Sequence, residues 1–295
     1  MTDSISTLML LGLTGSGKTN FLVALDVALD KQSDANGLVH ADLAADRSYL
    51  QPLKEKWLRG EELEHTSRLN PPSPHHLLVR QPATGATASL HLPDLAGETF
   101  DSHFITRSFP IDFRNRVKAA SGILLFVHCD SNADHTILQA PALMDVASSG
   151  PTSEPAAAIT EWSLEDAARQ VKLVDLIQFI LKVRAAAPSL RIAVLVSAWD
   201  LIENIPAALA EDCPKNPALF LAKRWPLLDQ FLRAHEERID FRAFGISARG
   251  GGTSPEDVAR LTALDSPVER LSVKDGDARS NDFTRPIRWL LGMSL

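Results

Sequence analysis

The apolar residues of this chain fall into short unbroken runs that are separated by stretches with a helical period. The clearest runs are 8–11, 122–128 and 192–196, and none of them contains Asp, Glu, Lys or Arg. Runs of this kind are typical of strands buried on both faces of a parallel sheet. The pattern predicts strands over 7–12, 77–79, 87–92, 122–128, 192–196 and 241–246, the last of these closing the sheet.

Between these runs the apolar residues recur at intervals of three and four, which is typical of helices with one buried face. Ser163 is expected to begin a helix whose buried stripe consists of Leu164, Ala167, Val171, Val174, Ile177, Ile180 and Leu181. The predicted helices cover 17–30, 38–58 with a break near Pro52, 113–120, the stretch from Ser163 to Leu181, 218–237 with Pro226 as a kink or early-turn residue, 255–264 and 285–291.

This alternation of strands and helices predicts an α/β fold with a doubly wound, mostly parallel sheet and helices on both faces. Residues 82–86 join 77–79 to 87–92 with Pro and Gly, so the sheet is expected to contain one antiparallel hairpin strand. In such folds ligands bind at the carboxyl ends of the strands. The residues that directly follow each strand are therefore the candidates for chemistry.

The chain is expected to form a single domain over 1–295, although its length alone permits two smaller ones. Residues 129–160 contain several prolines and a Ser-Ser-Gly sequence, and they are predicted to be an insertion loop. Residues 249–282 are predicted to be a loop-rich C-terminal region, and 94–110 form a polar segment without a clear period.

The composition excludes several classes of protein. The net charge is -7 and no block of Lys or Arg is present, so a nucleic-acid partner is not expected. No apolar run approaches the roughly 18–20 residues that a membrane helix needs, so we expect no direct membrane insertion. The cysteines, Cys129 and Cys213, form no Cys-x-x-Cys pair, and a reducing cytoplasm is the expected location.

A phosphate-binding loop follows the first predicted strand. The motif G-x-x-x-x-G-K-[ST] is complete in Gly12, Leu13, Thr14, Gly15, Ser16, Gly17, Lys18 and Thr19. Its glycines let backbone N–H groups turn around a phosphate, and the helix that follows adds partial positive charge. Lys18 is expected to reach the β- and γ-phosphates, and the Thr19 hydroxyl is expected to bind Mg²⁺.

A second polar motif, Asp94-Leu95-Ala96-Gly97-Glu98, follows the hairpin. Asp94 can hold a water on the Mg²⁺ that Thr19 binds, and the Gly97 N–H can contact a γ-phosphate. Asp-x-x-Gly turns are common, but this one follows a predicted buried strand. Its position supports a role in phosphate binding.

Two further motifs follow the later strands. In Ser197-Ala198-Trp199-Asp200, the Asp200 carboxylate can accept hydrogen bonds from N1–H and the 2-amino group of guanine, which adenine lacks. In Ser247-Ala248-Arg249, a backbone N–H can reach the guanine O6. Together these motifs predict a site for GTP and GDP, with Ser197, Asp200, Ser247 and Ala248 on the base.

The order of these motifs resembles that of the translation-factor-like (TRAFAC) P-loop GTPases, in which they correspond to the phosphate, switch II, guanine-specificity and Ser-Ala motifs. The wider pattern is similar to bacterial double-GTPase-type domains of predicted conflict or defence systems. The segments that carry this closer resemblance are 10–19, 46–50, 93–98 and 124–128. The resemblance implies a GTP-binding molecular switch that hydrolyses GTP slowly with Mg²⁺ and controls a protein effector or regulator.

Two positions depart from the usual GTPase pattern. Ala198 stands where the guanine motif normally has a Lys, so guanine preference rests chiefly on Asp200, and Trp199 can either pack near the base or lie in the core. Glu98 stands where many GTPases have the Gln that orients the attacking water. A Glu can orient that water or act as a general base, so Lys18, Gly97 and Glu98 are the candidate catalytic residues.

The switch I hydroxyl that completes the Mg²⁺ site is assigned to Thr66, with Ser67 and Ser73 as rivals. An internal arginine can also supply charge to the transition state, and the candidates are Arg47, Arg68 and Arg107. Two alternatives to the GTP switch stay open. One is a P-loop ATPase or kinase of other specificity, and the other is a nucleotide-binding scaffold with little turnover.

Overall fold

The computed structural model describes residues 5–31, 37–41, 50–63, 75–92, 97–129, 167–185, 189–205 and 213–294. Its strands are β1 (Ile5–Leu11), β2 (Val39–His40), β3 (His75–Arg80), β4 (Thr87–Leu92), β5 (Ala120–His128), β6 (Leu190–Ser197), β7 (Ile239–Ser247), β8 (Ser272–Asp275) and β9 (Ala278–Ser280). Its helices are α1 (Lys18–Lys31), α2 (Leu50–Leu58), α3 (Gly97–Thr106), α4 (Ile111–Ala119), α6 (Arg169–Val183), α7 (Trp199–Glu203), α8 (Pro217–Arg224), α9 (Pro226–Ala234), α10 (Pro255–Thr262), the 3₁₀ turn η4 (Pro267–Arg270) and α11 (Arg285–Leu290).

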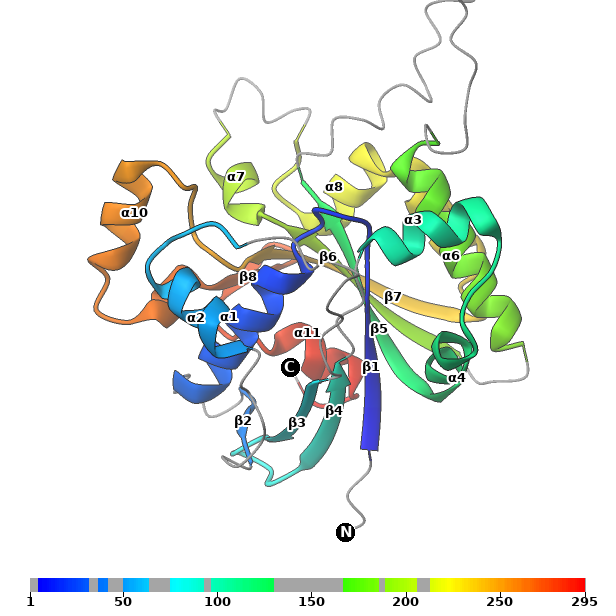
Figure 1. The fold of residues 1–295 in the computed structure, drawn as a ribbon, viewed down its shortest axis with the longest axis horizontal. Helices are drawn as coiled ribbons and strands as arrows, with labels where there is room; N and C mark the ends of the chain where they lie inside the picture. Colours follow the sequence, from blue (N-terminus) through cyan, green and yellow to red (C-terminus); the bar gives the residue numbers. More distant parts are fainter. Residues whose placement is uncertain are drawn as a thin grey trace, which may run out of the picture.

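All described strands belong to one sheet with the order β2-β3-β4-β1-β5-β6-β7-β8-β9 (Figure 1). From β4 through β1, β5 and β6 to β7, each strand is parallel to its neighbour. At one edge β3 and β2 are antiparallel, and at the other edge β8 and β9 are antiparallel. The prediction of a doubly wound, mostly parallel α/β fold is confirmed, but the antiparallel part is larger than the single hairpin strand expected.

Helices cover both faces of the sheet, as Figure 1 shows for α1 and α2 on one side and α3, α4 and α6 on the other. The two cores are separated by the alternation of side chains along each strand. Leu10 of β1 packs in the core under α1, α2 and α11, whereas the next residue, Leu11, packs in the core under α4, α6 and α9. Central strands buried on both faces explain the unbroken apolar runs of the sequence.

The register of the central strands brings their carboxyl ends together. His128 of β5 pairs with Ser197 of β6, and Ser197 pairs with Ile246 of β7. On the other side of β5, the end of β1 at Leu11 pairs with Leu125. The segments that follow β1, β5, β6 and β7 therefore begin at one edge of the sheet.

The helix predicted over 38–58 is wrong at its start. The strand β2 pairs with β3 there, and α2 begins only at Leu50. An edge strand of two residues leaves no periodic signal, because its conformation is set by its partner strand. The predicted helix over 218–237 is in fact two helices, since α8 and α9 meet at Trp225 and Pro226 is the first residue of α9.

A helix was missed in the segment 94–110, which showed no clear period. The structure has α3 there, with Phe100, His103 and Phe104 buried. His103 and Phe104 lie three and four residues after Phe100, which places them on the same helical face, and the polar residues between them obscured this pattern.

The C-terminal region was also predicted incorrectly. Residues 241–246 do not form the last strand, because β8 and β9 continue the sheet beyond β7. The helix predicted over 255–264 is confirmed as α10, but the rest of the region 249–282, which was predicted to be loop-rich, contains η4 and this hairpin. Short edge strands tolerate charged residues, so their sequence resembles that of a loop.

The helix that was expected to begin at Ser163 begins at Arg169 within the described residues. Val174, Ile177, Ile180 and Leu181 of its predicted stripe are buried, but Val171 is 36% exposed. Residues 130–166, which include most of the predicted insertion 129–160, lie outside the described residues.

Candidate nucleotide site

The phosphate loop lies between β1 and α1, as the sequence predicts. Gly15 and Gly17 have φ angles of +76° and +91°, which other residues adopt with strain. A Cβ at Gly17 would also lie 3.0 Å from the Cβ and Oγ of Ser197. Glycine at this position lets the loop approach the end of β6 closely.

The ammonium group of Lys18 is held inside the loop. Lys18 is only 7% exposed, and its Nζ donates hydrogen bonds to the carbonyl oxygens of Gly12 at 2.7 Å and Leu13 at 3.2 Å. It also lies 3.4 Å from the Ser16 hydroxyl oxygen. A buried positive charge that is held by backbone carbonyls is in place to exchange them for the stronger acceptors of a phosphate.

A cavity of about 330 Å³ joins the phosphate loop to the ends of the strands β5, β6 and β7. This volume lies in the range of small-molecule sites. The cavity brings together the loop after β1, Ser197 and Asp200 after β6 and Ala248 after β7, whereas the predicted residues Gly12 and Ser247 are not among those that line it. Its lining consists of Thr14, Gly15, Ser16, Gly17, Lys18, Thr19, Asn20, Glu62, Leu63, His128, Ser197, Ala198, Asp200, Leu201, Ala248, Arg249, Gly251, Gly252 and Thr253.

A residue in the left-handed backbone conformation forms the turn between β6 and α7. Ala198 has φ 54° and ψ 41°, and its carbonyl oxygen accepts hydrogen bonds from the Leu201 N–H at 3.0 Å and the Cys129 Sγ at 3.2 Å. This turn places Asp200 in the first turn of α7, where it lines the cavity. The small side chain of Ala198 lines the cavity at the position where related motifs carry a long lysine.

Trp199 belongs to the core. It is fully buried, and its ring contacts Phe220 edge-on at a centroid distance of 5.5 Å. Gly245 of β7 leaves the space for the indole, because a Cβ there would lie 2.3 Å from Trp199 Cδ2. The sequence allowed Trp199 either to pack near the base or to lie in the core. The structure places it in the core, because a side chain with no exposed surface does not contact a ligand in the cavity.

We expect Gly245→Ala to destabilise the fold by about 2 kcal/mol, since the added methyl group would push into a packed core. The displaced indole would also move the adjacent Asp200, so the affinity for GDP should fall with the stability. Denaturant unfolding and GDP titration measure the two effects. The matched control is Gly85→Ala, where no atom lies within 4 Å of the added Cβ and the φ of +69° is the remaining cost. If GDP affinity is unchanged in Gly245→Ala, the indole does not position Asp200.

The Ser-Ala loop is fixed by α2, which the sequence did not reveal. Trp57 Nε1 donates a hydrogen bond to the Ala248 carbonyl oxygen at 3.0 Å, and Arg249 donates to the carbonyl oxygen of Gly60. Burial lowers the pKa of the Arg249 guanidinium from its ordinary value, while nearby carboxylates, including Asp200, act in the opposite direction. The end of the cavity that Ala248 and Arg249 line is thus held by a helix that lies far away in the sequence.

Arg270 fixes the end of the same helix. Its buried guanidinium donates to the carbonyl oxygens of Trp57 at 2.9 Å and Leu58 at 3.0 Å, and it lies 4.9 Å from the Trp57 ring centre. Burial lowers the pKa of Arg270, and the charge of Arg249 acts in the same direction. A cation at a helix C-terminus satisfies carbonyl groups that have no partner within the helix.

Two hydroxyl groups near the cavity lack partners. The Oγ atoms of Ser197 and Ser247 are buried and have no hydrogen-bond partner within the described part of the chain. Buried hydroxyl groups are nearly always hydrogen-bonded, so these atoms are expected to bond to a ligand or a water. Ser197 lines the cavity directly, which agrees with its predicted place in the site.

The switch residues are less fully described. Gly97 and Glu98 form the start of α3, whereas Asp94, Thr66, Ser67, Ser73, Arg47 and Arg68 lie outside the described residues. Arg107 is described, and its guanidinium forms an ion pair with Asp175 of α6 and lies 4.7 Å from the ring centre of Phe104. The predicted Mg²⁺ ligand Thr19 is the second residue of α1 and lines the cavity, and its oxygen fits the preference of Mg²⁺ for oxygen ligands.

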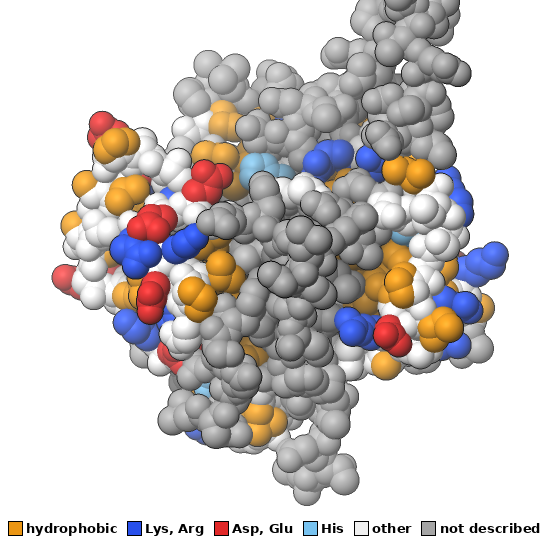
Figure 2. All heavy atoms as spheres, viewed as in Figure 1, with side chains coloured by type: hydrophobic (Ala, Val, Ile, Leu, Met, Phe, Trp, Pro, Cys, Tyr) orange, Lys and Arg blue, Asp and Glu red, His pale blue; other side chains and the backbone are white. Residues whose placement is uncertain are grey.

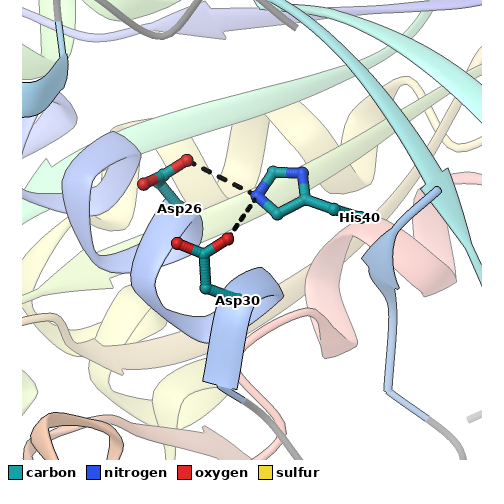
Figure 3. A group of neighbouring side chains, drawn as sticks. All are labelled: Asp26, Asp30 and His40. Atoms are coloured by element: carbon teal, nitrogen blue, oxygen red, sulfur yellow. Dashed lines mark ion pairs between the residues drawn. The ribbon is translucent and has the colours of Figure 1, made fainter. Parts of the chain in front are cut away.

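A separate cluster of acidic groups lies further along α1 (Figure 3). His40 Nε2 lies 3.5 Å from Asp26 Oδ1 and 3.4 Å from Asp30 Oδ1. Lys54 of α2 binds the same two carboxylates at 2.8 and 2.6 Å. Burial by itself would lower the pKa of Lys54, but its hydrogen bonds to the carboxylates and their charges raise it. Because an ammonium group already supplies the positive charge, the cluster ties α2 to α1 and does not resemble a metal site.

The fold and the phosphate loop define a P-loop nucleotide-binding protein. The profile of the Double-GTPase 1 family matches residues 9–290, so the chain belongs to that family. It is therefore a P-loop GTPase, an enzyme that binds guanine nucleotides and hydrolyses GTP. A comparison with curated proteins found no match.

Similar solved structures include other GTP-binding proteins. A chain of the signal recognition particle receptor SRb-GTP/SRX complex from Chaetomium thermophilum is 14% identical and matches with a TM-score of 0.41, over 84% of this chain and 93% of that one. The ADP-ribosylation factor-like protein or small COPII coat GTPase SAR1 from Encephalitozoon cuniculi, in complex with GDP, is 14% identical with a TM-score of 0.37, over 99% and 81%. A bacterial selenocysteine-specific elongation factor is 12% identical with a TM-score of 0.31, over 81% and 25%. Because these TM-scores are low, the classification rests on the family match.

Among the described residues, no helix combines the length and the apolar character that crossing a membrane requires.

Proposed function

We propose that this GTPase is a molecular switch that hydrolyses GTP slowly with Mg²⁺ and controls a protein partner. The observation that carries the proposal is that the phosphate loop, Asp200 and Ala248 line the same cavity. In parallel sheets, ligands bind at the carboxyl ends of the strands. Here the Lys18 ammonium, which would bind phosphate, and the Asp200 carboxylate, which would bind a base, line the same cavity.

The base would be held from two sides. The Asp200 carboxylate would accept hydrogen bonds from guanine N1–H and the 2-amino group, and the Ala248 N–H would donate to O6. The unpartnered Ser197 and Ser247 hydroxyl groups support a polar ligand at this end of the cavity. Because no lysine stands at Ala198, discrimination against adenine would depend mainly on Asp200.

Hydrolysis would use residues from the loop and the two switch segments. Lys18 and the Gly97 N–H would hold the γ-phosphate, and Glu98 would orient or deprotonate the attacking water. The Thr19 and Thr66 hydroxyl groups would bind Mg²⁺, and Asp94 would hold a water on the same ion. When bound, that ion neutralises charge on the β- and γ-phosphate oxygens.

A partner surface is expected beside α3, which directly follows the switch II motif. Ile105 of α3 is 40% exposed and Ile111 at the start of α4 is 72% exposed, so apolar surface is available to a partner there. Figure 2 shows Lys and Arg side chains gathered on the side of the molecule that α3, α4 and α6 form, and Arg114 and Arg116 belong to α4. A GTP-dependent shift of α3, which directly follows the switch II motif, would change this surface. The same proposal includes membership of the TRAFAC class, a bacterial conflict or defence role and a cytoplasmic location.

Turnover of Glu98→Ala separates a hydrolysing switch from a nucleotide-binding scaffold. We expect single-turnover GTP hydrolysis to fall by about 10²-fold, with GDP affinity unchanged, because a positioned acid–base group contributes about that factor. Glu256→Ala of α10 is the matched control and should keep the wild-type rate. Equal rates in Glu98→Ala and wild type would remove Glu98 from the mechanism, and faster hydrolysis of ATP than of GTP would indicate an ATPase.

A further inference from the structure

Two carboxylates lie on the wall of the nucleotide cavity, and the proposed function uses one of them. Among the described residues that line the cavity, the carboxylates belong to Glu62 and Asp200. Asp200 is assigned to the guanine base, whereas Glu62 belongs to the segment that follows α2 and contacts neither base nor phosphate in that proposal. Glu62 is therefore a candidate for binding the remaining part of a nucleotide, the ribose.

The turn that ends α2 fixes the direction of the chain toward Glu62. The Gly60 N–H donates to the Trp57 carbonyl oxygen at 3.0 Å. The Glu61 N–H donates to the Lys56 carbonyl oxygen at 3.0 Å. Gly60 has a φ of +72°, and this pair of bonds is the C-terminal cap that a left-handed glycine forms. The backbone directly before Glu62 is thus held by the end of the helix.

Glu62 lies between two anchored residues. On one side, the Gly60 carbonyl oxygen accepts a hydrogen bond from Arg249. On the other side, Leu63 is 7% exposed, packs in the core under α1 and lines the cavity. The charge of Glu62 acts on the Arg249 guanidinium, so the two side chains are near each other. Since Arg249 directly follows Ala248, Glu62 lies near the loop that the proposed function assigns to the base.

The neighbouring Glu61 has a different environment. Its carboxylate binds the Arg59 guanidinium, with Oε1 at 2.6 Å from Nε, and Glu61 is not among the residues that line the cavity. The two glutamates are adjacent in the sequence and carry the same charge. They differ in that Glu62 lines the cavity, so Glu61 provides a matched control.

The hydrogen-bonding groups of a guanine nucleotide restrict what Glu62 can bind. An ionised carboxylate only accepts hydrogen bonds, and the phosphate oxygens are acceptors that repel it. The donors of the nucleotide are N1–H and the 2-amino group of guanine, which Asp200 would bind, and the 2′- and 3′-hydroxyl groups of the ribose. In dinucleotide-binding folds an Asp or Glu accepts from the ribose 2′-hydroxyl in this way. The ribose hydroxyl groups are therefore the partners that remain for Glu62.

We propose that the Glu62 carboxylate recognises the ribose of the bound nucleotide by accepting hydrogen bonds from its 2′- and 3′-hydroxyl groups; this rests on the proposed placement of guanine at Asp200. The ribose connects the base to the phosphates, so a nucleotide that reaches from Lys18 to Asp200 has its ribose between them. Glu62 thereby selects ribonucleotides over 2′-deoxyribonucleotides. Because the ribose is common to GTP and GDP, Glu62 contributes equally to the binding of both.

The test is a competition between GDP and 2′-deoxy-GDP, which avoids hydrolysis. We expect the wild type to bind GDP about 10–100-fold more tightly, because hydrogen bonds to charged groups are strong. In Glu62→Ala this preference should fall below about threefold, through weaker binding of GDP at unchanged affinity for 2′-deoxy-GDP. The preference of the wild type should be the same with Mg²⁺ and with EDTA, since the ribose hydroxyl groups are not part of the metal site. Glu61→Ala should keep the wild-type preference.

Three results would overturn the ribose assignment while the proposed function stands. They are equal affinity of the wild type for GDP and 2′-deoxy-GDP, an unchanged preference in Glu62→Ala, and a preference that disappears without Mg²⁺, which would place Glu62 at the metal. Failure of the wild-type protein to bind guanine nucleotides would overturn both proposals together.

Discussion

Lys18→Met is expected to abolish measurable GTP hydrolysis and to weaken binding of GTP by about 10²–10³-fold. The buried ammonium is the charged donor that the phosphate loop holds ready, and charge-assisted hydrogen bonds to two phosphates contribute about 3–4 kcal/mol together. Titration with GTP and GDP, followed by single-turnover hydrolysis, measures the loss. Because the β-phosphate is common to both nucleotides, GDP affinity should fall as well, but less than GTP affinity.

The effect on folding should be smaller than the effect on binding. Methionine leaves the Gly12 and Leu13 carbonyls without the donors that Lys18 provides, but it also removes a charge from a site where only 7% of the residue is exposed. These contributions oppose each other, so denaturant unfolding should change by no more than about 1–2 kcal/mol. Lys182→Met, on the exposed side of α6, is the matched control. Wild-type nucleotide affinity in Lys18→Met would mean that the cavity is not the phosphate site.

Asp200→Asn is expected to change the base preference from guanine to xanthine. The carboxylate accepts from two donors of guanine, and an amide replaces one acceptor by a donor that suits the 2-oxo group of xanthine. A site built on such hydrogen bonds discriminates by about 10⁴-fold, so GTP affinity should fall by at least about 10²-fold. Competition among GTP, XTP and ATP, each with Mg²⁺, measures the change.

The matched control is Asp240→Asn, since this carboxylate is 56% exposed and pairs with Arg191 at the far end of β7. It should keep the wild-type preference. Equal binding of ATP and GTP that the Asp200 change does not alter would remove Asp200 from the site. The protein would then be a P-loop nucleotide-binding protein of broad base specificity, in contrast to its family.

The sequence was sufficient to predict those features that depend only on residues close together in the chain. The phosphate loop is one contiguous segment, and its glycines adopt backbone angles that are local properties of those residues. The buried central strands are equally local, because a run of apolar residues can be stable only where both faces are covered. From these strands, the rule that ligands bind at their carboxyl ends was enough to place Asp200 and Ala248 on one cavity.

The tertiary structure decided what depends on partners far away in the chain. Trp199 follows a strand, as a residue that contacts the base would. Only the tertiary structure, in which its indole is fully buried against Gly245, shows that it is a core residue. The strand β2 and the hairpin β8–β9 form because they pair with the longer strands β3 and β7. A strand that is stabilised by pairing of this kind needs no periodic pattern in its own residues.

The same reason explains why two residues that support the site were missed. Trp57 and Arg270 act through hydrogen bonds to carbonyl groups that are distant in the sequence. A carbonyl acceptor is present at every residue, so nothing in the amino-acid order marks the one that a particular side chain will reach. The sequence by itself predicted the nucleotide class of the site, and the tertiary structure decided which distant helix holds the Ser-Ala loop.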